Sequence, residues 1–241
     1  MNRNNIPRLF IDKELKKNIK LKLDKADQHY LKTVLRLLKG DKVKIFNGRS
    51  GEWEAVIDNT RGAILVCSHK IKEQKIEDGP SLYFSLIKNN SLKWMIEKAT
   101  ELGVSKLYPI ITERSNNKYF NAKKALIHIK EACEVSERLT VPVLEKVNTL
   151  DKILEQTKKN SDSLIFCNET RKDKFLQHYL SKKKKKKISF LIGPEGGFSI
   201  QEEENIKSYK HVISVKLFNR LIRAETAAIM ALSIFNSYKK I

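Results

Sequence analysis

The residues best suited to chemistry form a glycine-rich loop, residues 191–199, with the sequence Leu-Ile-Gly-Pro-Glu-Gly-Gly-Phe-Ser. An apolar run precedes the loop and an acidic segment of helical character, residues 201–209, follows it, so the pattern predicts a strand, a tight turn and a helix start. Three glycines allow positive φ angles and remove the Cβ atoms that would keep a ligand from the main chain, while Pro194 fixes one φ angle. The loop is therefore suited to bind a ligand through its peptide groups.

The chemistry of this loop excludes the common phosphate-binding motifs. It has neither the Lys-Ser/Thr of a P-loop nor the G-x-G-x-x-G fingerprint, and Glu195 would repel a phosphate. Ser199 and Glu202 have the spacing of a capping box, which places the helix start directly after the loop. A cationic or neutral ligand fits better. Taken alone, the loop is also compatible with a turn whose glycines serve geometry only.

A second polar junction occupies residues 215–228, with the sequence Val-Lys-Leu-Phe-Asn-Arg-Leu-Ile-Arg-Ala-Glu-Thr-Ala-Ala. It joins an apolar run, residues 211–217, to an alanine-rich segment of helical pattern that ends near Tyr238. Ligands of open α/β sheets bind outside the carboxyl ends of the strands, where such junctions gather. We therefore predict that the two junctions form one crevice.

The two junctions resemble the two signature motifs of the RsmE-type methyltransferases, which methylate N3 of a uridine in 16S ribosomal RNA. Residues 191–198 and 220–227 carry these motifs. Other matching segments, in chain order, are residues 6–10, 34–37 with 39–41, 98–104, 111–115, and Arg138 with Val141-Pro142. The chain departs from the family pattern at Val135, which replaces an amide side chain, and at Phe218, which replaces a glycine.

The resemblance implies an α/β fold and two domains. The C-terminal domain would be a SPOUT α/β domain whose deep trefoil knot cradles S-adenosylmethionine, and a small N-terminal PUA-like β-barrel would bind RNA. Nothing in the periodicity of the sequence indicates a knot, which is very rare among folds. The resemblance also implies a homodimer that acts on 16S rRNA of the small ribosomal subunit.

The resemblance assigns roles to individual residues. Those expected to bind S-adenosylmethionine are Thr112, Glu113, Gly193, Glu195, Gly196, Gly197, Leu217, Leu221, Ile222, Thr226 and Ala227. Those expected to contact RNA are Arg8, Arg36 and Arg114. Those expected to be catalytic are Arg223, Glu225 and Arg138.

Methylation of uracil N3 needs a methyl donor in line, a base opposite it and loss of the N3 proton. Arg223 and Arg138 are the candidates to stabilise the resulting negative charge, because arginine stays protonated. The proton acceptor is left open between Glu225, Glu113 and water. A purely structural alternative for Arg223 and Glu225 is an ion pair that orders the loop.

Composition favours an RNA partner and a cytoplasmic protein. The 241 residues include 48 Lys and Arg against 28 Asp and Glu, a net charge of +20, which points to a polyanion. A lysine-favouring codon bias would produce a similar excess. Three dispersed cysteines and five scattered histidines form no ligand spacing, so we expect neither disulfides nor a metal site. No apolar run approaches the ~18 residues of a membrane span, and no secretory signal is visible.

The pattern along the chain predicts three regions: a PUA-like domain at 1–72, a linker at 73–80 and the catalytic domain at 81–241. In the first region we expect strands at 9–11, 19–23, 42–46, 52–57 and 63–69. A helix at 28–38 would bury one apolar stripe and turn a basic face outward; the stripe consists of Tyr30, Leu31, Val34, Leu35 and Leu38.

Beyond the linker, strands and helices alternate, as in a parallel α/β sheet. We expect strands at 82–87, 106–112 and 164–167, and helices at 92–102 and 123–138. The lysine run 182–187 is interpreted as a solvated loop. Two rival functions remain at this level: a related knotted methyltransferase with another RNA substrate, and a non-catalytic RNA-binding protein.

Overall fold

The computed structural model describes residues 6–59, 64–115, 117–159, 163–170, 172–181 and 187–238. The chain divides into two compact units. The first comprises Met1–Ile76 and Cys133–Val141, and the second comprises Glu77–Ala132 and Pro142–Ile241. The division at Ile76 falls inside the predicted linker. Residues 133–141, which we had assigned to the catalytic domain, belong instead to the first unit. Most of the lysine run, residues 182–186, and residue 63 of a predicted strand lie outside the described residues.

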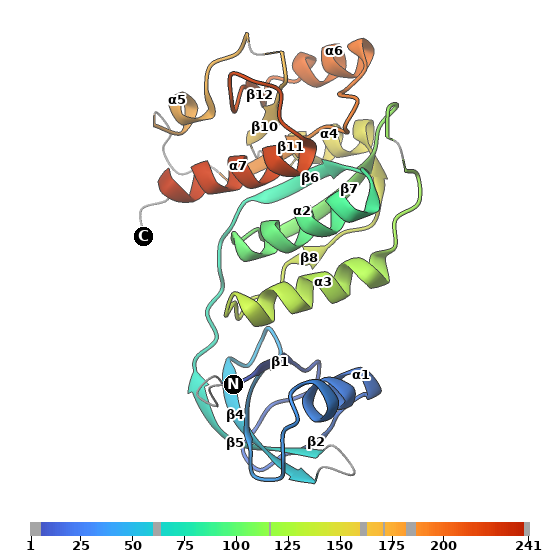
Figure 1. The fold of residues 1–241 in the computed structure, drawn as a ribbon. Coiled ribbons are helices and arrows are strands. Elements are labelled where there is room, and N and C mark those ends of the chain that lie inside the picture. Colours follow the sequence, from blue (N-terminus) through green and yellow to red (C-terminus); the bar gives the residue numbers. More distant parts are fainter. Residues whose placement is uncertain are drawn as a thin grey trace. The chain divides into compact units, whose positions relative to one another are not determined.

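The first unit is a five-stranded sheet in the order β1-β3-β4-β5-β2, which curls into a PUA-like half-barrel (Figure 1). Only β1 and β3 are parallel, and the other pairs are antiparallel. Its elements are β1 (Arg8–Phe10), β2 (Lys20–Lys22), α1 (Lys25–His29), the π-helical segment η1 (Tyr30–Val34), β3 (Lys42–Phe46), β4 (Glu52–Asn59) and β5 (Ile64–Lys72).

The helical part of this unit differs from the prediction. The structure has a short α-helix followed by a π-helical turn in place of one helix at 28–38. Of the predicted apolar stripe, Leu31 is buried, whereas Tyr30, Val34 and Leu38 are exposed. In a π-helix the main-chain hydrogen bonds join residues five apart in place of four. Side chains three and four residues apart therefore no longer lie on one face, as they would in an α-helix. The prediction of a packed stripe was therefore wrong for these three residues.

Arg8 lies in the interior of the first unit. Its Nε contacts Glu52 Oε1 in a buried ion pair, and its other nitrogens donate to the main-chain oxygens of Cys133 and, at 2.5 Å, Arg138. Its guanidinium also lies 3.7 Å from the centre of the Phe46 ring. These bonds hold the segment 133–141 within the first unit.

Lys72 extends this set of charges to the surface. Its Nζ lies 3.3 Å from Glu52 Oε2 and 2.9 Å from Glu137 Oε2. The hydrogen bond from Lys72 lowers the pKa of the Glu137 carboxyl, and the same bond raises the pKa of Lys72. Glu137 therefore supplies a second, exposed connection between strand β5 and the segment 133–141.

The second unit is built on a seven-stranded parallel sheet in the order β12-β10-β11-β6-β7-β8, with β9 also paired to β7. Its strands are β6 (Ser81–Ser85), β7 (Lys106–Ile111), β8 (Val143–Leu144), β9 (Asn148–Thr149), β10 (Ser163–Cys167), β11 (Ile188–Ile192) and β12 (Val212–Val215). Its helices are α2 (Asn89–Glu101), α3 (Ala122–Val135), α4 (Leu150–Lys159), α5 (Leu176–Ser181), α6 (Ile200–Ser208) and α7 (Ala224–Tyr238), and the last three residues of α3 belong to the first unit.

Helices cover both faces of this sheet, which explains why its strands are apolar throughout. On one face, Leu191 and Phe166 pack in a cluster with Leu154 of α4 and Ile206 of α6. On the other face, α7 lies alongside α2 (Figure 1) and the Phe235 ring meets Phe190 of β11 edge-on. The sheet is thereby fixed from both sides. The order of the strands does not show whether the chain is knotted. The trefoil knot therefore stays a prediction.

The part of the chain that the structure describes contains no helix long and apolar enough to cross a membrane.

Candidate active site

A cavity of about 300 Å³ opens at the carboxyl ends of three neighbouring parallel strands, β10, β11 and β12. Three loops line it, one after each strand, together with one residue of α6 and two residues of the first turn of α7. The lining residues are Phe166, Cys167, Asn168, Glu169, Ile192, Gly193, Pro194, Glu195, Gly197, Phe198, Glu203, Leu217, Phe218, Arg220, Leu221, Ile222, Arg223, Ala224 and Ala227. The predicted crevice between the two junctions is therefore present, and a third loop contributes to it.

The register of the strands brings these loops together. Phe166 of β10 is paired with Leu191 of β11, and Cys167 with Val215 of β12. Since all three strands are parallel, their carboxyl ends meet at the same edge of the sheet, where α/β proteins bind ligands. The neighbouring strands thus hold the three loops around one space.

Two glycines of the first loop are required by close approach. A Cβ on Gly193 would lie 2.8 Å from the Phe198 ring. Gly197 has a φ angle of +68°, and a Cβ there would lie 2.2 Å from Oε1 of Glu169. Gly196 differs, because its Cβ would meet only Arg114 at 3.7 Å, an ordinary contact. The loop is therefore constrained at its first and last glycines.

Contacts from outside the loop hold its main chain in place. The Ser199 side chain accepts a hydrogen bond from the Glu202 N–H, and the Glu202 carboxyl accepts one from the Ser199 N–H, so the predicted capping box is confirmed. Arg114 donates to the main-chain oxygens of Gly196, at 3.1 Å, and Phe198, at 3.3 Å. The loop is thus fixed at its helix end and along its middle.

The cavity wall carries both negatively and positively charged side chains. Glu169, Glu195 and Glu203 contribute carboxylates, although the chain as a whole has a net charge of +20. Exposed Arg220 and Arg223 lie on the loop after β12, and the side chain of Arg223 has no hydrogen bond or ion pair among the described residues. A wall of this kind suits a ligand with a cationic centre and leaves one guanidinium available for an anion.

Comparison with known proteins places the chain in a family. A family profile described as an RNA methyltransferase domain matches residues 78–236, and a profile described as an RNA methyltransferase PUA domain matches residues 23–66. The chain belongs to the RNA methyltransferase family.

Relatives from this family match nearly the whole chain. Ribosomal RNA small subunit methyltransferase E of Rickettsia conorii is 34% identical over 230 residues, covering 94% of this chain and 93% of the relative. The protein of the same name from Buchnera aphidicola is 31% identical and covers 95% and 94%. A methyltransferase structure from Legionella pneumophila, solved with S-adenosylmethionine bound, superposes with a TM-score of 0.84 at 27% identity, covering 97% and 98%.

The structure brings many of the predicted methyltransferase site residues to the cavity. Those predicted to bind the cofactor that line it are Gly193, Glu195, Gly197, Leu217, Leu221, Ile222 and Ala227, and predicted catalytic Arg223 joins them. They come from the two predicted junctions.

Other residues predicted to bind the cofactor lie outside the wall. Gly196 faces Arg114, and Thr226 is an exposed residue of α7 that does not line the cavity. Thr112 is buried, with hydrogen bonds to Ser85 and Ser115 hydroxyls, and the Glu113 N–H donates to Glu202. Thr112 and Glu113 belong to the turn after β7, which packs against the start of α6 through the bond from Glu113 to Glu202.

Glu225 is not part of the cavity wall either. Its side chain is buried, and its Oε1 accepts a hydrogen bond from the Ser91 hydroxyl at 3.1 Å. In the described residues it makes no ion pair with Arg223, so the structural alternative of a paired loop is not realised. Glu225 instead connects the first turns of α7 and α2.

The predicted arginines fall into different environments. Arg138 is buried in the first unit and is absent from the lining of the cavity. Arg8 is enclosed by its ion pair with Glu52, so the expectation that it contacts RNA is not met by its placement. Arg36 is exposed, with a φ angle of +53°, and Arg114 is exposed while bonding the glycine loop.

The loop after β10 was not predicted to belong to the site. The strand at 164–167 was predicted, but Asn168 and Glu169 after it were not assigned to the site. A polar pair directly after a buried strand was the available signal. Asn168 is held by hydrogen bonds to Asp173, at 3.0 Å, and Ser214, at 3.2 Å. Burial raises the pKa of the neighbouring Cys167 thiol, which keeps it protonated and unsuited to act as a nucleophile.

Proposed function

We propose that this protein uses S-adenosylmethionine to methylate N3 of a uridine in 16S ribosomal RNA of the small subunit. The observation that carries the proposal is the cavity at the ends of β10, β11 and β12, which is lined by residues of both motif loops. Family membership and the two relatives named for small-subunit ribosomal RNA support the substrate class.

The residues present fit this cofactor. A cavity of about 300 Å³ lies at the lower end of the range for small-molecule sites. Gly193 and Gly197 leave the main chain bare where a side chain would intrude, and Glu169, Glu195 and Glu203 offer carboxylates to a ligand that carries a sulfonium and an ammonium. The bound cofactor of the Legionella relative supports the same assignment.

When bound, S-adenosylmethionine supplies an electrophilic methyl group. The chain must orient the uracil opposite this group and stabilise the charge left on the ring oxygens when N3 loses its proton. Arg223 is the residue of choice, because it is exposed, lines the cavity and has no partner in the described structure. Of the three candidate proton acceptors, water is favoured, since neither Glu225 nor Glu113 lines the cavity.

Arg36 and Arg114 remain the proposed RNA contacts among the predicted arginines, because both are exposed. Arginine suits this role, since its planar guanidinium can make paired bonds to phosphate. We further propose a homodimer in the cytoplasm. Helix α7 supports the dimer, because Ile229, Met230 and Ile234 are only partly buried by the rest of the chain.

The direct test is mass mapping of small-subunit RNA from cells that lack this protein. We expect one uridine to lose its methyl group, and purified protein with S-adenosylmethionine should restore that methyl group to N3. Restoration at a different nucleotide would show a related methyltransferase with another substrate. Absence of S-adenosylmethionine binding would favour the non-catalytic alternative.

A further inference from the structure

A second cavity, of about 180 Å³, lies in the second unit between α2, the segment 119–121 and α3. Its lining combines two aromatic rings with two lysines and a histidine: Tyr119, Phe120, Lys93, Lys124 and His128. None of these residues lines the first cavity or belongs to the motif loops. The site proposed for the methyl donor therefore leaves this group of side chains without a role.

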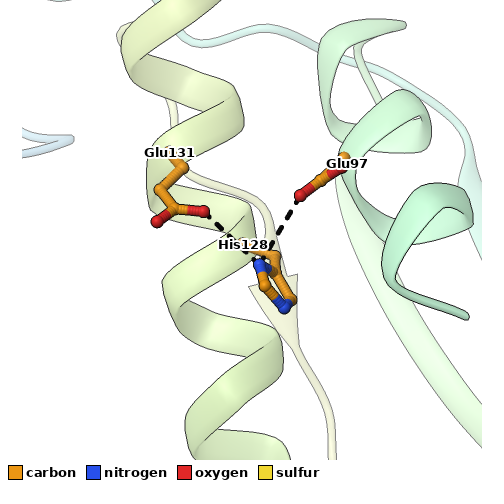
Figure 2. Close-up of side chains that lie close together, drawn as sticks. All are labelled: Glu97, His128 and Glu131. Carbon is orange, nitrogen blue, oxygen red and sulfur yellow. Dashed lines mark hydrogen bonds and ion pairs between the residues drawn. The ribbon is translucent and has the colours of Figure 1, made fainter. Parts of the chain in front are cut away.

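His128 has an unusual pair of environments, which Figure 2 shows. Its Nδ1 lies 3.4 Å from Glu131 Oε2 on α3 and 3.5 Å from Glu97 Oε1 on α2. The His128 side chain is 10% exposed, and its Nε2, on the side away from the carboxylates, has no hydrogen-bond partner among the described residues. This nitrogen is itself buried, so His128 forms a fixed part of the cavity wall and does not offer Nε2 to a ligand.

The two carboxylates fix the position of the His128 ring. Because Glu97 and Glu131 come from different helices, they also set the orientation of the ring between α2 and α3. The wall of the second cavity is thus held in place at this ring.

The rest of the lining suits a nucleotide as well. Tyr119 is 74% exposed, so its ring is accessible to a ligand, and Phe120 lies beside it in the lining. Lys93 and Lys124 are exposed and carry positive charge on the same cavity. Aromatic rings that stack bases, combined with lysines that meet phosphates, are the means by which proteins bind single-stranded nucleic acid.

The first turn of α2 borders both cavities. Asn89 lines the second cavity, and the N–H of the preceding residue, Lys88, donates to Oε1 of Glu195 at 3.3 Å. Glu195 belongs to the wall of the first cavity. A strand of RNA whose target base reaches the first cavity can therefore place a neighbouring nucleotide at the second.

We propose that the second cavity is a subsite for a nucleotide that flanks the target base in single-stranded RNA. The flanking base stacks on Tyr119, while Lys93 and Lys124 meet the phosphates. The assignment rests on the proposed function, since it deepens the description of how this enzyme holds its RNA.

The test is the affinity of the full chain for a short fluorescein-labelled oligouridylate, measured by fluorescence anisotropy. Tyr119→Ala should weaken binding about tenfold, the size expected for one base stacked on an aromatic ring. Tyr238→Ala is the matched control, because Tyr238 is also an exposed tyrosine of this unit and lies outside the cavity, and it should bind as the wild type does.

The lysines are tested by the salt dependence of the same affinity. The double variant Lys93→Ala, Lys124→Ala should lower the slope of log K against log salt by about 1.4, or about 0.7 for each lost phosphate contact. Lys152→Ala removes an exposed lysine of α4 and should leave the slope unchanged.

Three results would overturn the assignment. Wild-type affinity in Tyr119→Ala would remove the stacking platform. Weaker RNA binding after EDTA treatment would show that Glu97, His128 and Glu131, whose ligand atoms lie within 4.8 Å of one another, hold a metal ion instead. A change in oligomeric mass with unchanged RNA affinity would show a contact between chains. Methyl-donor binding and methylation by the wild type, measured in parallel, report on the proposed function independently.

Discussion

Arg8 and Arg223 are the same residue type in opposite situations. Arg8 has its guanidinium enclosed by a carboxylate, two main-chain oxygens and an aromatic ring inside the first unit. Arg223 is exposed on a cavity wall of the second unit and has no side-chain partner among the described residues. The first arginine is committed to the fold, and the second is available to a ligand.

This difference separates stability from activity. A buried guanidinium has already exchanged water for protein partners, so its loss leaves a carboxylate uncompensated. An exposed guanidinium keeps its bonding capacity for the moment when negative charge develops in the reaction. We therefore expect substitutions at Arg8 to change the free energy of unfolding and substitutions at Arg223 to change turnover.

Arg8→Ala should have the largest effect. It leaves Glu52, which is fully buried, without its main partner, and we expect the free energy of unfolding to fall by about 3–5 kcal/mol. Urea denaturation measures this change. Arg36→Ala, an exposed arginine in the same unit, is the control and should stay within about 0.5 kcal/mol of the wild type. A loss below about 1 kcal/mol at Arg8 would contradict its structural role.

Arg223→Ala should lower kcat about a hundredfold or more, because one donor to the developing charge is lost. Its free energy of unfolding should be unchanged, since the side chain contacts no partner in the described structure. Single-turnover methylation of small-subunit RNA measures the effect, and Arg223→Lys should retain part of the rate because it keeps the charge. Wild-type turnover in Arg223→Ala would show that this residue has no part in the mechanism, and the distinction between a structural Arg8 and a catalytic Arg223 would fail.

The glycine loop allows the same contrast between two adjacent residues. Gly197→Ala forces a side chain into a φ of +68° and against Glu169, so we expect S-adenosylmethionine to bind about tenfold more weakly, with left-handed strain of about 1–2 kcal/mol. Gly196→Ala meets only an ordinary contact with Arg114 and should bind within about twofold of the wild type. Calorimetry that found equal losses in both variants would show that the loop geometry does not govern binding.

The smallest expected effect is on the pH dependence of stability, and it concerns the ion pair between Lys72 and Glu137. Since Lys72 lowers the pKa of Glu137 in the folded protein, this carboxyl contributes stability above its ordinary pKa of 4.5 and loses it as the pH falls through the lowered value. The contribution should be below about 1 kcal/mol, because Glu137 is exposed. In Glu137→Gln, the unfolding midpoint should depend less steeply on pH between about 5 and 3. An unchanged pH profile would show that this pair adds nothing to the fold.

Local signals made the glycine loop predictable. An apolar strand, a glycine turn and a capping box lie within about twenty consecutive residues, and each signal restricts the backbone where it stands. The structure places β11, the loop and α6 accordingly. The second junction was identified in the same way, from a strand pattern followed by an alanine-rich helix.

The parts that escaped prediction depend on distant contacts. Asn168 and Glu169 join the site because β10 lies between β11 and β12 in the sheet. The order of strands depends on contacts between distant segments, so no local sequence pattern predicts it. Arg8 was taken for an RNA contact because its partners lie 44 and more than a hundred residues away. Tyr30 and Val34 were predicted to be buried because an α-helical period was assumed where the chain forms a π-helical turn.

The central claim is that the loops after β10, β11 and β12 form one pocket for the methyl donor. A crystal structure of the wild-type protein with S-adenosylmethionine tests it most directly. We predict electron density for the cofactor between the main chain of residues 192–198 and that of residues 217–224, with its methyl group facing Arg223. Density anywhere else on the chain, with this cavity filled only by solvent, would contradict the account.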